Sequence, residues 1–98
     1  MIMTVLEAQV AQPNWEALER SYQQAAENRD AGIAQSFLVQ NKKDAELWQI
    51  ITIWESQEAL YAMRSSGETP RGILIFRSAN AEPELSIYEV TKHVPAIR

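Results

Sequence analysis

Two tryptophans, a tyrosine and an arginine carry groups that could bind and activate an aromatic ligand. Trp48 and Trp54 are six residues apart in an alternating segment, so both project from one face of a strand. Tyr61 and Arg64 are three residues apart, which places them on one face of a helix. The indoles could wall an apolar pocket, and the phenol and guanidinium could polarise a phenolate or quinone oxygen. Alternatively, the tryptophans lie in the core or at a dimer contact, and Tyr61 and Arg64 lie on a solvated helix face.

His93 and Arg71 are two further candidates. His93 is the only histidine in the chain and titrates near neutrality, so it could act as a general base. We place it at the end of the last predicted strand, where a surface histidine or one at a dimer edge is the alternative. Arg71 follows Pro70 in a predicted loop and could gate a ligand, with ordinary exposure as the alternative.

The composition excludes several classes of site. The 98 residues include no cysteine and one histidine, which excludes disulfides, thiolate metal sites, cysteine nucleophiles and a multi-histidine metal site within one chain. We therefore expect no metal and no cofactor. The net charge of −4 opposes nucleic acid and anionic membranes as partners. No signal-peptide pattern and no apolar run of ~20 residues is visible, so we expect a cytoplasmic protein.

The predicted elements follow a β-α-β-β-α-β order. Strands are expected at residues 2–10, 33–40, 47–54 and 85–94, with helices from about 15 to 28 and from Ser56 to Gly67. The apolar run at residues 73–76 could be a strand or a helical turn. This order predicts one α+β domain over residues 1–98, with a ferredoxin-like fold and a four-stranded antiparallel sheet.

Strand 47–54 is apolar on both faces, so both faces must be covered. One face carries the two tryptophans and the other carries Ile51 and Ile53. In strand 33–40, we place Ile33, Phe37 and Val39 on one common face. Two helices cover one face of the sheet, and an exposed apolar sheet face is a partner site. We expect a homodimer in which two sheets pack as a dimeric α/β barrel.

The segments Ile53-Trp54-Glu55-Ser56-Gln57-Glu58-Ala59-Leu60 and Ile87-Tyr88-Glu89-Val90 resemble the antibiotic biosynthesis monooxygenase-like family of the dimeric α/β-barrel superfamily. The resemblance covers nearly the whole chain. This family includes cofactor-independent monooxygenases, haem-degrading enzymes and small proteins of unknown role. The resemblance therefore implies the fold, and it suggests a cofactor-independent monooxygenase acting on a small aromatic or quinol-type substrate.

The quinol-oxidising relatives place an asparagine and a tryptophan four residues apart at the end of the third strand, with a tyrosine and an arginine nearby. Trp54 matches that tryptophan, whereas Ile50 stands at the asparagine position and departs from the pattern. Tyr61 lies in the corresponding helix. The resemblance thus implies catalytic roles for Trp54, Tyr61 and Arg64. The predicted substrate-binding residues are Trp48, Ile50, Arg71, Phe76, Arg77 and His93.

Two other functions were weighed against this one. Haem-degrading relatives use an asparagine on the first strand, a tryptophan in the second helix and a histidine after that helix. This chain has Glu7 and Ala8 in the strand region, Met63 in the helix and Ile73 near the histidine position. Haem degradation is therefore not expected. The second alternative is a non-catalytic homodimer of the same fold that binds a small aromatic ligand or a protein partner.

Overall fold

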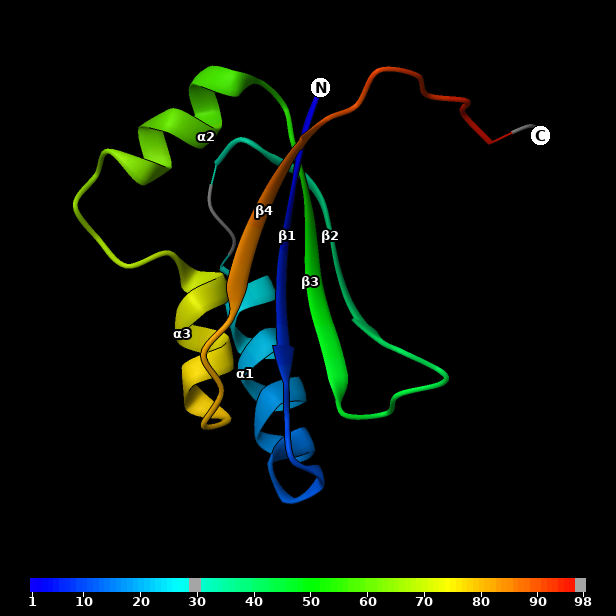
Figure 1. Ribbon diagram of the computed structural model, residues 1–98. Helices are drawn as coiled ribbons and strands as arrows, with labels where there is room; N and C mark the ends of the chain where they lie inside the picture. The colour runs from blue at the N-terminus through cyan, green and yellow to red at the C-terminus, as the bar shows by residue number, and fades with distance from the viewer. Residues whose placement is uncertain (29–30, 97–98) are drawn as a thin grey trace.

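A computed structural model describes residues 1–28 and 31–96 (Figure 1). Its elements, in chain order, are β1 (Ile2–Gln9), a 3-10 turn η1 (Gln12–Asn14), α1 (Trp15–Ala26), β2 (Ile33–Gln40), β3 (Leu47–Trp54), α2 (Gln57–Arg64), α3 (Arg71–Ser78) and β4 (Glu84–Glu89). None of the helices in the described residues is long and apolar enough to cross a membrane.

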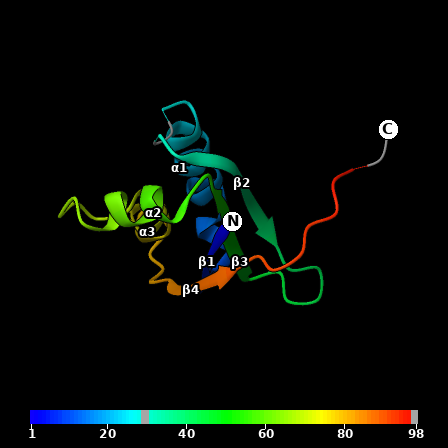
Figure 2. The same cartoon turned by 90° about the horizontal axis from the view of Figure 1, so that it is seen from above.

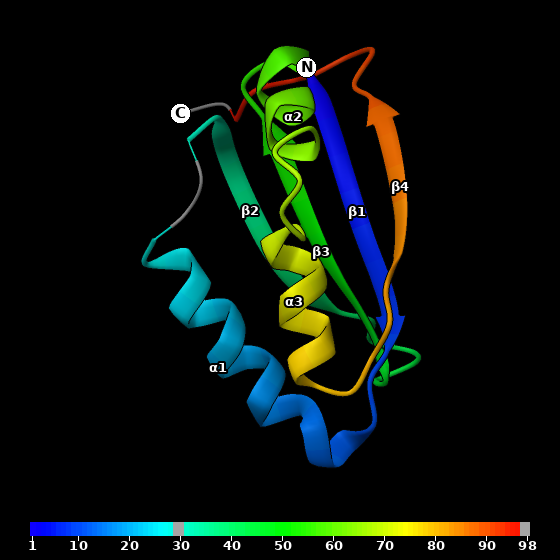
Figure 3. The ribbon, with the colours of Figure 1, turned by 90° about the vertical axis from the view of Figure 1, so that its left-hand side faces the viewer.

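The four strands form one antiparallel sheet in the order β2-β3-β1-β4. All three α-helices lie over the same face of this sheet, as the view onto the helix layer shows (Figure 3). Seen from above, the C-terminal segment extends away from the helix layer (Figure 2). This arrangement confirms the predicted α+β ferredoxin-like fold.

β3 has the bounds that its alternating pattern predicted, and its burial alternates strictly. Trp48, Ile50, Thr52 and Trp54 are buried beneath the helices, and the intervening residues are half-buried on the open face. Both tryptophans therefore lie on the sheet face that the helix layer covers, and not on the open face.

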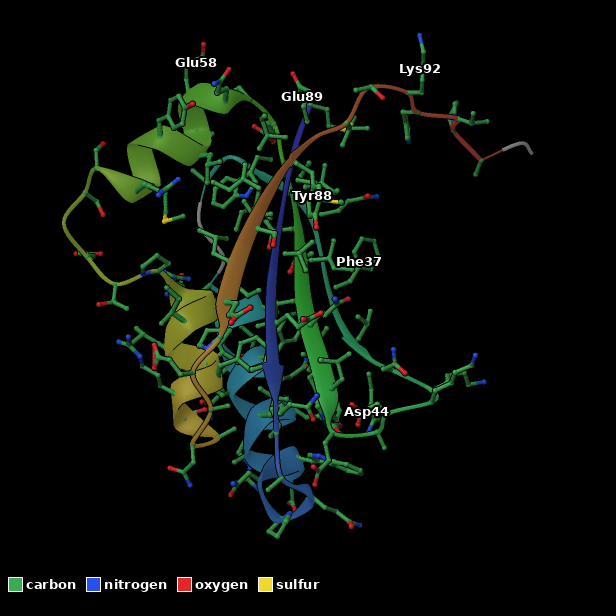
Figure 4. All side chains as sticks on the ribbon, in the orientation of Figure 1. Phe37, Asp44, Glu58, Tyr88, Glu89 and Lys92 are labelled. Atoms are coloured by element: carbon green, nitrogen blue, oxygen red, sulfur yellow. The ribbon has the colours of Figure 1, made fainter. Side chains whose placement is uncertain are left out.

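β2 contains an irregularity that the sequence did not reveal. Ile33 pairs with Trp54, but Gln35 pairs with Ile53, so one extra residue stands in β2 at that point. A bulge of this kind reverses the side-chain alternation. Ile33 therefore packs beside Trp54 on the helix side, while Phe37 points away from the helices (Figure 4). The prediction that Ile33 shares a face with Phe37 and Val39 was wrong.

β4 is shorter than predicted. It ends at Glu89. Directly after it, the backbone N of Val90 donates a hydrogen bond to the carbonyl oxygen of Met1 at 2.9 Å. Glu89 pairs with Ile2, the first residue of β1, so the following residues have no strand beside them. The placement of His93 on the last strand was therefore wrong.

A third helix replaces the predicted loop and short apolar run. α3 begins at Arg71, directly after Pro70, which is extended with φ −55° and ψ 143°. Its side chains Ile75 and Phe76 are buried. Arg71 thus lies in the first turn of a helix instead of in a loop.

α2 begins as the sequence predicted. The Ser56 side chain caps the helix, because its Oγ accepts a hydrogen bond from the backbone N of Ala59 at 3.1 Å. Behind this cap, Leu60 is buried against Ile2 and Trp54 in a small apolar cluster. A larger cluster around Leu18 and Phe76 fills the other end of the sheet. The core therefore has two parts along the helix-covered face.

Candidate functional site

A cavity of about 250 Å³ lies between the helix-covered sheet face and the helices. All four strands and all three α-helices contribute to its wall. The lining includes the apolar side chains Leu6, Ala25, Ile33, Ile50, Leu60, Met63, Ile73, Ile75 and Leu85. A partly open, mostly apolar hollow with a few polar groups has the form of a small-molecule site.

Trp54 forms one wall of this cavity. It is buried, and its indole Nε1 donates a hydrogen bond to Thr4 Oγ1 at 3.0 Å. Because this hydrogen bond joins β3 to β1, it fixes the orientation of the indole ring. Ile50, four residues earlier on the same face, lines the same cavity. The structure thus brings together the two positions that the resemblance singled out.

Three hydroxyl groups form a row across the cavity floor. Thr52 pairs with Thr4 on β1 and with Ser36 on β2, and all three residues line the cavity. Tyr22, from α1, donates its OH to Ser36 Oγ at 2.9 Å. The row therefore places polar oxygens within an otherwise apolar floor.

Two arginines line the cavity from the helix layer. Arg64 is the last residue of α2, and Arg71 is the first residue of α3. Arg64 is exposed at the rim, and its side chain makes no hydrogen bond or ion pair with the part of the chain that the structure describes. Arg64 is therefore available to an anionic or polarised oxygen of a ligand.

Three other predicted site residues lie outside the cavity wall. Tyr61 is 53% exposed, and its OH accepts a hydrogen bond from Gln57 Nε2 at 2.6 Å. Phe76 is completely buried in the larger core cluster. Trp48 also belongs to that cluster and makes an edge-to-face contact with Trp15, with ring centroids 5.9 Å apart. Phe76 and Trp48 thus occupy the packed core.

Arg77 and His93 are also remote from the cavity. Arg77 binds Glu82 through both Nε and Nη2, with the closest contact at 2.8 Å. Hydrogen bonding to Arg77 lowers the pKa of the Glu82 carboxyl, and the same contact raises the pKa of Arg77. His93 is exposed in the segment after β4. Neither residue lines the cavity, so the structure does not join them to Trp54 and Arg64.

Sequence reasoning missed the polar residues of the cavity: Thr4, Tyr22, Ser36 and Thr52. The alternation of β3 already placed Thr52 on the face of Trp54, so one of them was within reach of the sequence. The others became neighbours only through strand register. Among the described residues, no carboxylate or imidazole lines the cavity.

The match to a family model now identifies the class of protein. Residues 1–71 match the model of the antibiotic biosynthesis monooxygenase family, and the chain belongs to this family. A comparison with curated proteins finds no significant match.

Solved structures share the fold at low sequence identity. A proposed antibiotic biosynthesis monooxygenase from Deinococcus radiodurans is 13% identical, with a TM-score of 0.73 and both chains covered completely. SnoaB, a cofactor-independent oxygenase from Streptomyces nogalater, is 13% identical, with a TM-score of 0.71 and 97% of each chain covered. MhuD, with two manganese protoporphyrin IX molecules bound per active site, is 19% identical, with a TM-score of 0.72 and coverage of 98% of this chain and 100% of MhuD. At these identities, the likeness defines the fold and leaves the chemistry open.

Proposed function

We propose that the protein is a cofactor-independent monooxygenase that acts on a small, electron-rich aromatic substrate such as a quinol. The observation that carries this proposal is the apolar cavity lined by Trp54, with the exposed Arg64 at its rim. A phenolic substrate held there contacts apolar side chains of both the sheet and the helix layer. Trp54 offers a flat apolar surface for the substrate ring.

The chemistry draws its electrons from the substrate. Arg64 stabilises the phenolate, which raises the ionised fraction without a side-chain base. The phenolate transfers an electron pair to O₂, a bond forms between a ring carbon and oxygen, and the peroxide anion takes up the proton that the phenol released. The resulting hydroperoxide loses the proton of that carbon while its O–O bond breaks. The net change is phenol plus O₂ to quinone plus water, with one atom of the O₂ in the quinone and the other in the water.

Oxygen consumption over a panel of phenols and quinols tests this proposal. Arg64→Gln is expected to lower kcat/KM by about 10²-fold, a loss typical of one oxyanion-stabilising group. Trp54→Phe is expected to raise KM, because the wall of the cavity recedes. Arg20→Gln is the matched control, since Arg20 pairs with Glu16 on the exposed side of α1. An Arg64→Gln protein with unchanged turnover would contradict the proposed role of the guanidinium.

The second candidate function is a non-catalytic small-ligand binder of the same fold. The absence of a carboxylate or imidazole from the described cavity wall favours it, because no side-chain base stands next to the ligand. This candidate predicts saturable binding of aromatic ligands with no oxygen uptake across the panel. Haem handling is not expected, and a haemin titration without a Soret shift would agree with that.

We further propose that the open sheet face pairs with the same face of a second copy. Phe37, Val39 and Tyr88 are 47%, 36% and 50% exposed, and the half-buried Ile51 and Ile53 lie between them. Figure 4 places Phe37 and Tyr88 on the side of the sheet away from the helices. Removing such a patch from water favours association.

A further inference from the structure

Thr52 is a buried residue whose hydroxyl has no hydrogen-bond partner in the described part of the fold. Thr52 is 9% exposed and lines the cavity, and its side chain makes no hydrogen bond within residues 1–28 and 31–96. Among those residues, Trp48 Nε1 is the one side-chain nitrogen or oxygen that is both fully buried and unpaired. The unpaired Thr52 Oγ1 therefore keeps some accessible surface. An unpaired polar group at this depth costs free energy unless water or a ligand binds it.

The two neighbours of Thr52 in the hydroxyl row are already partly engaged. Thr4 Oγ1 accepts from Trp54 and Ser36 Oγ accepts from Tyr22. A hydroxyl can donate one hydrogen bond and accept two, so Thr52 retains its full capacity. It can accept from a phenol O–H and can donate to a quinone carbonyl. Thr52 therefore suits both the reduced and the oxidised form of one oxygen substituent.

Arg64 supplies a different kind of polar contact on the other side of the cavity. Thr52 belongs to the sheet floor and Arg64 to the helix layer above it. Apolar side chains such as Ile50, Leu60 and Ile73 contribute to the wall around them. A ligand that satisfies both ends needs two oxygen substituents at opposite ends of an apolar body, with the group at Arg64 ionised.

The cavity volume limits the size of that apolar body. An apolar protein cavity of ~150 Å³ accepts one benzene molecule. The volume of about 250 Å³ is larger than this, yet it is smaller than the ~300 Å³ at which pockets for drug-sized ligands begin. The volume therefore matches two fused rings, whereas three or four rings would extend through the open side of the cavity.

We propose that the cavity binds a two-ring aromatic that carries a neutral hydroxyl or carbonyl at Thr52 and an anionic oxygen group at Arg64. The oxidation of this substrate class rests on the proposed function. The selectivity of the cavity for such ligands depends on binding alone. Thr52 is a specificity-determining residue, because it distinguishes ligands that carry the buried oxygen from ligands that lack it.

Binding titrations without turnover test this proposal, with tryptophan fluorescence or calorimetry as the readout under anaerobic conditions. The probes are 6-hydroxy-2-naphthoic acid, 2-naphthoic acid, 2-naphthol and anthracene-2-carboxylic acid. The hydroxy acid is expected to bind about 3- to 10-fold more tightly than 2-naphthoic acid, which lacks the hydroxyl. Thr52→Val is expected to remove that preference while leaving the affinity for 2-naphthoic acid unchanged. Arg64→Gln is expected to weaken both acids more than 2-naphthol, because only the acids carry a full negative charge before they bind.

Thr91→Val is the matched control, because Thr91 is exposed in the segment after β4. The proposal is overturned if Thr52→Val keeps the wild-type preference, or if the anthracene acid binds as tightly as the naphthalene acid. If the Thr52→Val variant still binds 2-naphthoic acid, its cavity is intact, so the same experiment also controls for misfolding. Selective binding without oxygen uptake would refute the monooxygenase while leaving the ligand class standing. Oxygen uptake with larger substrates alone would refute the ligand class while leaving the monooxygenase standing.

Discussion

The indole N–H of Trp54 and the hydroxyl of Thr4 form a hydrogen bond between adjacent strands, with Nε1 and Oγ1 3.0 Å apart. Both residues are buried, at 4% and 7% exposure. This hydrogen bond holds the ring of Trp54 in the cavity wall. Trp54, the candidate residue that the sequence indicated, is thus positioned by Thr4, which the sequence did not indicate.

Replacing Thr4 with valine is expected to destabilise the fold by about 1–3 kcal/mol, because the buried indole N–H loses its acceptor. Urea unfolding followed by far-UV circular dichroism measures the change. Thr91→Val serves as the control, and it is expected to lie within ~0.5 kcal/mol of the wild-type protein because its side chain is exposed. Equal stabilities for the two variants would show that the hydrogen bond contributes nothing.

Gly32 is expected to tolerate alanine less well than Gly67. Both have positive φ, 92° and 84°, so alanine costs about 1–2 kcal/mol at each on conformational grounds. A Cβ on Gly32 would stand 2.6 Å from the Cβ of Ala59 in α2, whereas one on Gly67 would meet nothing within 4 Å. Gly32→Ala should therefore show a larger loss in unfolding free energy. Equal losses would mean that α2 moves aside without cost.

Phe37→Glu is expected to convert a dimer into a monomer, because it places a charge within the apolar patch of the open face, beside Ile51. Sedimentation velocity at micromolar concentration measures the association state. Leu74→Glu is the matched control, since Leu74 is 51% exposed on α3, on the helix side of the sheet. A wild-type protein that sediments as a monomer would contradict the proposed pairing of sheets.

Glu82 is expected to titrate below the ordinary range of a glutamate, because hydrogen bonding to Arg77 lowers its pKa. When the pKa of a carboxyl is lower in the folded state than in the unfolded state, its ionised form stabilises the folded protein at pH values above the unfolded-state pKa. This stabilisation is lost as the pH falls through the folded-state pKa. NMR titration of the Glu82 carboxyl carbon measures the shift. In Arg77→Gln the pKa should return toward its ordinary value, and an unchanged titration would refute the pairing in solution.

The errors made from the sequence have specific physical causes. The alternation of residues 85–94 predicted a strand as far as Val94, but alternation does not report whether a neighbouring strand is present. β1 begins at Ile2, so pairing stops at Glu89. The bulge in β2 was equally invisible, since neither Gly nor Pro marks it. Residues 73–76 are too few to separate a strand from a helix by periodicity.

The sequence by itself determined the order of the four strands and of α1 and α2, the bounds of β3 and the face shared by Trp54 and Ile50. These follow from local propensity and from the period of the side chains along one strand. The family was indicated by a resemblance of residues 53–60 and 87–90 and is shown by the match to its model. The tertiary structure decided which residues surround Trp54. Thr4, Ser36 and Arg64 come from three other elements, and strand register and helix packing bring them to the cavity. Such proximity depends on contacts between distant segments, which no local pattern encodes.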